Sequence, residues 1–594
     1  MNERELRGLI EQVRSGTLQR RTFLRRVSAV GFSVPMAGML LLHAGVAQAQ
    51  AASAYKPTRR GAGGMLKMLF WQGPTLLNPH FANGSKDAEG SRLFYESLVL
   101  FDADANMIPL LAAEVPSRAN GGLPADGKSV TWKLKRGVTW HDGAPFTADD
   151  VLFNWQFASD PATAAVTVGA YLDLKFEKID SHTVRVLFNK PTPFWAGAHS
   201  GLMLIPKHLF APYGGAKSRD APANLKPVGT GPYRFLEFRP GDLVKGELNP
   251  NYHLPNRPHF DSVEIKGGGD AVSAARAVLQ TGEYDFAWNL AVEDEILKRL
   301  ESGGKGRVLF TPGGNTEHIQ INFSDPYVET EGERAHPKSR HPILNDLAVR
   351  QALVLLVDRT GIQDNIYGRG GIATANYLNA PARFRSPNQK FEFSVARAEA
   401  LLDASGWRRG ADGVREKAGK RLKFLFQTST NAPRQKAQAI IKQACQKAGI
   451  ELELKAVNAA VYFSSDVGNP DTSGKFWADL QMFTVTLGSP DPELYMQRFV
   501  SWEASSKANK WLGRNNMRWR SEEFDTTYRA AEYEMDPVKR AALYIRLNDL
   551  ACNDVAVIPV VYRPDPSGAG NKLVAPMSGL DNVLGFLQDW YREA

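Results

Sequence analysis

An unbroken apolar run at residues 555–562 constrains the fold of this chain more than any other feature. The run reads VAVIPVVY and follows a helical pattern that begins at Asp536-Pro537. A strand that is apolar at successive positions is buried on both faces, as at the centre of a sheet that helices cover. The chain is therefore expected to build an α/β fold around a central strand.

Strands and helices also alternate elsewhere in the sequence, which is typical of an α/β architecture. Apolar residues at every second position predict strands, and a stripe at helical spacing predicts helices. Thr147 with Asp150 forms a capping box that opens one helix. The expected strands lie at 65–70, 130–134 and 450–456, and the expected helices begin at 147 and 433, the second ending at Gly449.

The N-terminal segment has the pattern of an export signal. Arg20-Arg21-Thr22-Phe23-Leu24-Arg25 matches a twin-arginine motif, an apolar stretch follows at about 27–46, and Ala47-Gln48-Ala49 is an A-x-A cleavage site. The alternative is a membrane anchor, but Gly31, Pro35 and Gly38 break the stretch and it contains His43. We expect a twin-arginine signal peptide at 1–49, cleaved near Ala49, a periplasmic protein, and a flexible leader at 50–64.

Composition excludes some classes of protein. The formal net charge of +9 includes seven arginines against three glutamates in the first 26 residues, and no dense basic run or nucleic-acid motif follows. We therefore expect no nucleic-acid partner. Cys445 lies in a helical pattern as a small core residue, and the sequence leaves open whether it pairs with Cys552.

An ordered set of short motifs is the most specific feature of the chain. The strongest block spans 108–153 and includes Trp140-His141-Asp142-Gly143, in which His141 and Asp142 are expected to be turn residues. Together the motifs resemble the dipeptide- and oligopeptide-binding proteins of ABC importers, family 5 of the extracellular solute-binding proteins. The later matches are at 205–208, 228–233, 350–353, 358–359, 400–407 and 490–492.

The resemblance implies a type II periplasmic-binding-protein fold, with two α/β lobes joined by a hinge and an extra subdomain in the first lobe. The first crossing between lobes is expected near 311–317, where Pro312-Gly313-Gly314 is a flexible break, and the return near 553–559. Lobe I would comprise 65–95, 229–311 and 556–594, the extra subdomain 96–228, and lobe II 312–555. Such proteins close around a solute by hinge motion, and this one would act as a monomer that delivers its solute to ABC importer permease subunits.

Candidate substrate-binding residues follow from the resemblance and from position in the chain. Aromatic rings, amides and an arginine suit a pocket for polar ligands with apolar parts. The candidates follow the first strand, the first crossing and the Asp-Pro motif at 491–492, and they are Asn78, His80, Asn83, Glu317, His318, Thr486, Gly488, Asp491, Trp502, Trp511, Arg514 and Asn515.

One departure from the family pattern bears on the ligand. In relatives that bind peptides, an aspartate four residues before the proline of the Asp-Pro motif holds the α-ammonium of the ligand, and here that position is Gly488. A peptide or peptide-like solute is the leading ligand, with Glu317 as an alternative carboxylate. A solute without a free α-amine stays open: an opine, a glycoconjugate, or a metal complex held by His80 and His318.

Motifs for catalysis and metal binding are incomplete. The chain has no H-E-x-x-H, no C-x-x-C and no G-x-S-x-G, and a calcium-like loop from 102 lacks the glycine and glutamate that such a loop needs. We expect no metal site, no cofactor and no enzymatic activity. A periplasmic hydrolase on the same fold, and a chemoreceptor partner or chaperone-like binder, remain as alternatives.

Overall fold

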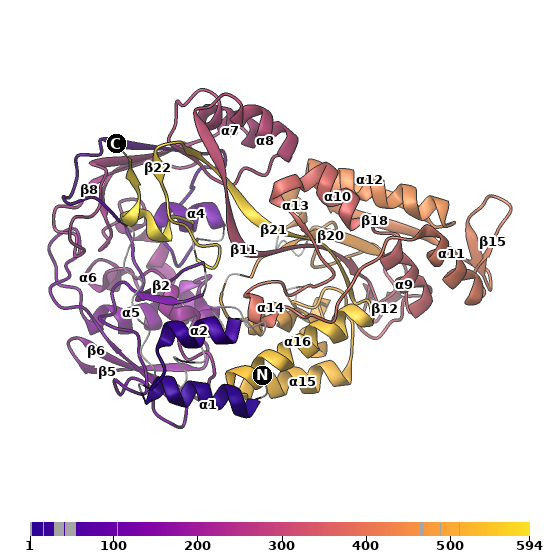
Figure 1. Ribbon diagram of the computed structural model, residues 1–594, viewed down its shortest axis with the longest axis horizontal. Helices are drawn as coiled ribbons and strands as arrows, with labels where there is room; N and C mark the ends of the chain where they lie inside the picture. Colours follow the sequence, from indigo (N-terminus) through magenta and orange to yellow (C-terminus); the bar gives the residue numbers. More distant parts are fainter. Residues whose placement is uncertain are drawn as a thin grey trace.

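The chain forms two lobes joined by two long strands, β11 (Gly306–Ile321) and β21 (Val557–Gly570), which cross the middle of the molecule (Figure 1). The predicted α/β fold is confirmed. The structure is a computed structural model that describes residues 3–15, 17–28, 41, 55–82, 84–103, 105–463, 468–487, 489–509, 511, 513–581 and 583–593.

An 11-stranded sheet runs through both lobes. The short strand β14 (Ile372–Ala373) pairs with β21 beside the main path. The predicted strand at 65–70 is β1, and the predicted strand at 450–456 is β19. The order along the sheet is β19 (Glu451–Val457), β18 (Lys423–Ser429), β20 (Leu480–Val485), β11, β21, β10 (Phe286–Ala287), β1 (Met65–Phe70), β9 (Ser262–Gly267), β8 (Leu243–Leu248) and β7 (Tyr233–Arg239).

The apolar run at 555–562 lies at the centre of this sheet, as predicted. Within the run, β21 pairs antiparallel with β11 on one side, and Val561 and Tyr562 pair with β14 on the other. Val557, Ile558, Val560 and Val561 are buried, because α16 (Pro537–Asn553) leads into the strand and packs against it. Burial on both faces follows from this central position.

The two crossing strands lose their pairing at one level. Thr311 pairs with Asp565, the next pair is Asn315 with Arg563, and 312–314 lie unpaired between them. The Pro-Gly-Gly break predicted for the first crossing coincides with this gap. The expected return at 553–559 stays a prediction. The gap interrupts the backbone ladder between β11 and β21 at this level.

Segment 96–228 builds its own small sheets outside the main one. β4 (Ser129–Lys133), β6 (Thr183–Phe188) and β5 (Leu174–Asp180) form an antiparallel sheet, and β2 (Val99–Phe101) pairs with β3 (Met107–Pro109). The capping box predicted at Thr147 and Asp150 is confirmed at the start of α5 (Ala148–Ser159), which packs on β5 and β6. The division of the chain into lobes and subdomain by residue number stays a prediction.

The remaining elements cover the sheet and its edges. Both cysteines are free: Cys445 is buried in α12 (Ala432–Lys447), and Cys552 is half-buried in α16. None of the described helices combines the length and apolar character needed to cross a bilayer. The other described α-helices are α4 (Ser85–Ser91), α6 (Lys207–Phe210), α7 (Ala271–Leu279), α8 (Asp294–Glu301), α9 (Leu347–Leu355), α10 (Arg359–Ile362), α11 (Val395–Ala404), α13 (Ala459–Tyr462), α14 (Glu493–Met496) and α15 (Glu522–Tyr533). The short strands β12 (Glu329–Thr330) and β13 (Glu333–Arg334), β15 (Arg408–Arg409), β16 (Arg415–Lys417) and β17 (Lys420–Arg421), and β22 (Leu573–Val574) and β23 (Tyr591–Arg592) form separate small sheets.

Two N-terminal helices, α1 (Glu3–Arg14) and α2 (Arg20–Ser28), lie against the body of the molecule near α15 and α16 (Figure 1). Leu6, Val13, Phe23 and Val27 form a small apolar cluster, against which Val538 packs. Arg7 forms an ion pair with Asp536. The twin-arginine motif at 20–25 lies in α2, whereas the A-x-A site at 47–49 lies outside the described residues.

Candidate ligand-binding site

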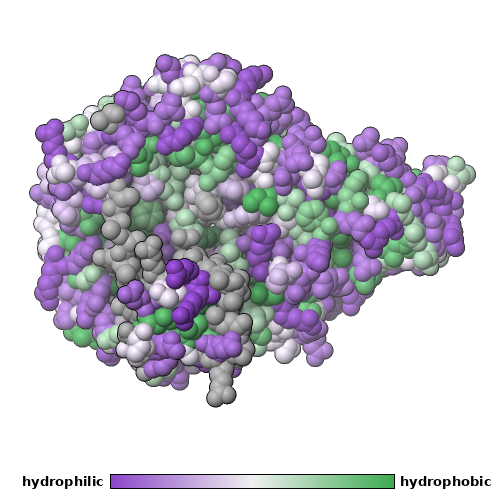
Figure 2. Space-filling view, in the orientation of Figure 1, coloured by the Kyte–Doolittle hydropathy of each residue, from purple (hydrophilic) through white to green (hydrophobic). Residues whose placement is uncertain are grey.

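A cleft of about 730 Å³ lies between the two lobes. One wall comes from the N-terminal lobe, with Lys86, Trp288 and Asp581, and the other comes from β20 and the residues after it, with Thr484 and Thr486. The size is that of a site for a small organic ligand. The outer surface in Figure 2 is mostly hydrophilic, and hydrophobic residues show towards the hollow in the middle of this face.

Polar side chains from the three central strands form the floor of the cleft. The lining residues are Asn315 on β11, Arg563, Asp565 and Ser567 on β21, and Thr484 and Thr486 on and after β20. Residues that face one another in neighbouring strands, or stand two apart in one strand, point to the same side of a sheet. The floor is therefore a polar patch set into a largely apolar sheet at the level of the pairing gap.

Glu317 is buried next to the cleft and contacts two of the floor residues, Arg563 and Thr484. It is 2% exposed, pairs with Arg434 at 3.0 Å and with Arg563 at 3.7 Å, and accepts a hydrogen bond from the Thr484 hydroxyl. Burial alone would raise the pKa of Glu317, but the charges of Arg434 and Arg563 outweigh it and lower the pKa to about 2. The carboxylate is thus ionised at neutral pH and fixes Arg563 at the cleft.

Asn315 connects the two crossing strands. Its Nδ2 donates to Asp565 Oδ1 at 2.6 Å, and its Oδ1 accepts from the Thr486 hydroxyl at 2.5 Å. Burial raises the pKa of Asp565, an effect that the charge of Arg563 and the bond from Asn315 oppose. One side chain therefore sets the orientation of a carboxylate on β21 and a hydroxyl from the other lobe.

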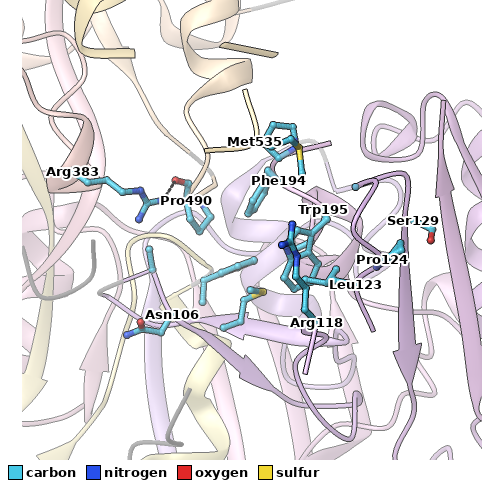
Figure 3. A pocket seen from close by; sticks show the side chains of 16 residues that line it. Asn106, Arg118, Leu123, Pro124, Ser129, Phe194, Trp195, Arg383, Pro490 and Met535 are labelled. Carbon is cyan, nitrogen blue, oxygen red and sulfur yellow. Dashed lines mark hydrogen bonds between the residues drawn. The ribbon is translucent and has the colours of Figure 1, made fainter. Parts of the chain in front are cut away.

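A second, smaller cavity of about 80 Å³ adjoins the cleft, because Phe101 lines both (Figure 3). It lies between the extra subdomain, which contributes Phe194 and Trp195, and lobe II, which contributes Pro490 and Met535. Its walls are mainly apolar. Arg383 Nη2 donates to the Pro490 carbonyl at 3.1 Å on the lobe II side.

The candidates after the first strand hold a loop together. Asn78 is buried and donates to Asn224 at 2.7 Å, and both ring nitrogens of His80 are bonded, to Thr167 and Asn154. The neighbouring residues Pro79 and Ala82 line the cleft. Asn83 lies outside the described residues.

The candidates near the first crossing and the Asp-Pro motif lie at different depths. Thr486 lines the cleft and Glu317 lies one layer behind it. His318 is fully buried, with its ring edge-on to Tyr377 and Phe483. Asp491 is buried in an ion pair with Arg540. Gly488 lies outside the described residues, and its neighbour Ser489 lines the cleft.

The four candidates after the Asp-Pro motif lie away from the floor. Trp502 is 43% exposed and stacks under Arg529, Trp511 lies against Lys475, and Arg514 is exposed. Asn515 is buried and donates to the backbone carbonyls of Val500 and Trp519, so it closes a loop. A ligand-contact role for any of the twelve candidates stays a prediction.

Sequence reasoning missed the charged residues of the floor, Arg563 and Asp565. A signal for them was present, because the apolar run at 555–562 is followed at once by the alternation Arg563-Pro564-Asp565-Pro566. Opposite charges at the end of a buried strand point to a polar site. Among the described residues, no three His, Cys, Asp or Glu side chains gather as metal ligands.

Comparison with known proteins agrees with this geometry. The model of the bacterial extracellular solute-binding proteins, family 5, matches residues 106–507. This chain belongs to that family. The family 5 chain is 27% identical to the oligopeptide-binding protein AppA of Bacillus subtilis over 393 residues, which are 65% of this chain and 67% of AppA. It is also 27% identical to the glutathione-binding protein GsiB of Pectobacterium atrosepticum, over 65% of this chain and 68% of GsiB.

Solved structures show that the fold is shared. The structure of AppA in complex with a nonapeptide has a TM-score of 0.70 at 23% identity and covers 91% of this chain and 100% of AppA. NikZ from Campylobacter jejuni, in complex with Ni(L-His), has a TM-score of 0.71 at 22% identity and covers 89% of this chain and 99% of NikZ. The type II periplasmic-binding-protein fold with two lobes and a hinge is thereby confirmed for this family 5 protein.

Proposed function

We propose that this family 5 protein captures a peptide or peptide-like solute between its lobes and delivers it to the permease subunits of an ABC importer. The observation that carries the proposal is the cleft of about 730 Å³ at the pairing gap of β11 and β21, with walls from both lobes. A ligand that touches both walls stabilises the closed arrangement, which distinguishes loaded from empty protein. The relatives named for oligopeptides and glutathione support a peptide-like cargo.

The same proposal includes export by the twin-arginine route, removal of residues 1–49 and action as a monomer in the periplasm. The motif at 20–25 and the A-x-A site at 47–49 support it. Changing Arg20 and Arg21 together to Lys is expected to leave the full-length chain in the cytoplasm. N-terminal sequencing of the exported wild-type chain is expected to begin near Gln50, and export of the double variant at wild-type yield would contradict the route.

A non-peptide solute is the second candidate, favoured by the glycine at position 488. An opine, a glycoconjugate or a metal complex has no free α-amine, so its binding needs no carboxylate at position 488. A hydrolase on the same fold is the alternative from another class. Both are decided by the same experiment on the exported protein.

The experiment is a thermal-shift screen of di- to pentapeptides and other small solutes, followed by mass spectrometry of each solute that binds. A ligand present at 100 times its dissociation constant adds about 2.7 kcal/mol to the stability of the protein. We expect stabilisation by at least one solute that is recovered unchanged. A solute recovered in cleaved form would overturn the binding function in favour of an enzyme. A screen without any stabilising solute, with none co-purified in native mass spectrometry, would overturn it altogether.

A further inference from the structure

Three residues at alternate positions of β21 face the cleft: Arg563, Asp565 and Ser567. Alternate residues of a strand point to the same face and lie about 6.6 Å apart. Their side chains form a short row along the floor, which begins at the gap in pairing with β11. We call these three residues the β21 row.

Each member of the β21 row has a polar group without a partner in the part of the chain that the structure describes. The guanidinium of Arg563, 17% exposed, donates no hydrogen bond, and its single ion pair to Glu317 is long, at 3.7 Å. Asp565 accepts one bond, on Oδ1 from Asn315, which leaves Oδ2 without a donor. The hydroxyl of Ser567 is buried and unpaired.

The other charged residues that line the cleft are already paired. Lys86 donates to Thr75 and to Asp87 at 2.8 Å. Glu89 accepts two backbone N–H groups, from Val583 and Leu584. Asp581 pairs with Arg92 at 2.8 Å. These residues hold the wall together, whereas the β21 row keeps free bonding capacity.

Buried polar groups nearly always have a partner, and each one without a partner needs an explanation. Arg563 Nε and the Ser567 hydroxyl are two such groups, and they flank the half-buried carboxylate of Asp565 at the floor of the cleft. Partners that the ligand brings would explain all three. A guanidinium matches a carboxylate in shape and charge. The free oxygen of Asp565 accepts from an ammonium, and the hydroxyl of Ser567 either donates or accepts.

The spacing of the row restricts the ligand. Arg563 and Asp565 stand two residues apart on β21, so the negative and positive groups of the ligand must lie within reach of both side chains. An extended chain separates its ends by about 3.3–3.6 Å for each residue, which places the charged termini of a tripeptide roughly 10 Å apart. In an α-amino acid head, the ammonium and the carboxylate share one carbon atom.

We propose that the β21 row binds such an α-amino acid head, so that the cargo is a solute with this head and a longer tail, as in a γ-glutamyl peptide. This inference rests on the proposed function and narrows its ligand. The cleft is far larger than the head alone, which leaves room for a tail.

Two isomeric peptides test the proposal by titration calorimetry on the exported protein. γ-L-glutamyl-L-leucine carries the head, whereas α-L-glutamyl-L-leucine has the same atoms with the α-carboxylate used in the peptide bond. We expect the γ isomer to bind at least about tenfold more tightly. Arg563→Gln and Asp565→Asn should each weaken it by about tenfold or more, because each removes a charge-assisted hydrogen bond. N-acetylation of the γ isomer should have an effect similar to that of Asp565→Asn.

Arg546→Gln is the matched control, since Arg546 is an exposed arginine of α16 that pairs with Glu523 and does not line the cleft. It should change the affinity less than about threefold. Arg563→Lys keeps the charge and serves as a second variant if Arg563→Gln fails to fold. It should also bind the ligand more weakly, because an ammonium lacks the planar pair of N–H donors of the guanidinium.

Several results would overturn the inference: no binding of the γ isomer, equal binding of the two isomers, or wild-type affinity in both row variants. If other solutes still stabilise the protein in the thermal-shift screen, only this inference falls. If none does, the proposed function fails with it.

Discussion

Asn315 and Asp565 are joined by a hydrogen bond of 2.6 Å that links the two strands crossing between the lobes. The bond lies beside the gap where β11 and β21 lose their backbone pairing, so a side-chain contact replaces part of the missing ladder. The pairing gap between the crossing strands thus lies at the floor of the cleft. In the proposed function, a ligand held there contacts the strands about which the lobes close.

Asn315→Ala is expected to lower the stability of the unliganded protein by about 1–3 kcal/mol, because it leaves the half-buried carboxylate of Asp565 without its donor. Scanning calorimetry measures this as a lower melting temperature. Asn365→Ala is the matched control, since Asn365 is exposed and bonds only within its own turn. An equal shift in the two variants would show that Asn315 has no special role.

The ion pairs of Glu317 should make the protein sensitive to acid. Its pKa is about 2 in the folded chain and about 4.3 in an unfolded one, so the folded state favours the ionised carboxylate. The resulting stability, about 3 kcal/mol, is fully present above pH 5 and is lost as the pH falls from 5 to 2. Glu317→Gln should therefore be less stable at pH 7 and show a shallower loss between pH 5 and 2. Parallel melting curves for wild type and variant across that range would contradict the assignment.

Gly314 is expected to tolerate no side chain. A Cβ atom there would lie 2.2 Å from Leu487 Cβ and 3.0 Å from the Leu487 backbone nitrogen, so β11 would have to move away from the residues after β20. Overpacking of this kind costs about 1–3 kcal/mol. Gly314→Ala should lower the melting temperature, whereas Gly169→Ala, where a Cβ meets nothing within 4 Å, should not. Equal melting temperatures for the two variants would rule out this contact.

The two thiols should be inert in the native protein. Burial raises the pKa of Cys445 and of Cys552 to about 12, and only the thiolate reacts with aromatic disulfides. At pH 8 we expect less than about one tenth of a thiol to react per native chain, and both cysteines of the sequence to react in denaturant. Without a reductant, failure to detect two thiols in denaturant would indicate a disulfide.

The sequence predicted the scaffold more completely than the site. Hydrophobic periodicity located β1, α12, β19 and β21, because burial on one or both faces of an element determines which of its neighbouring residues are apolar. The capping box at Thr147 was visible for the same reason, since both partners lie within one helical turn.

The cleft depends on long-range pairing, which no local pattern reveals. Asn315, Thr486 and Asp565 meet only because β11 pairs with both β20 and β21. His80 and Asp491 looked equally suited to a ligand, yet each finds its partners within the protein. Whether a polar side chain is already satisfied is a property of the folded chain, and Arg563 and Asp565 combine free bonding capacity with a place in the cleft lining.

Small-angle X-ray scattering of the exported protein, with and without the solute that stabilises it most, tests the central claim most directly. If the lobes close over a solute held at the hinge, the radius of gyration should fall on saturation, and it should fail to do so in an Arg563→Gln, Asp565→Asn double variant. Superimposable curves for the empty and saturated wild-type protein would contradict the account.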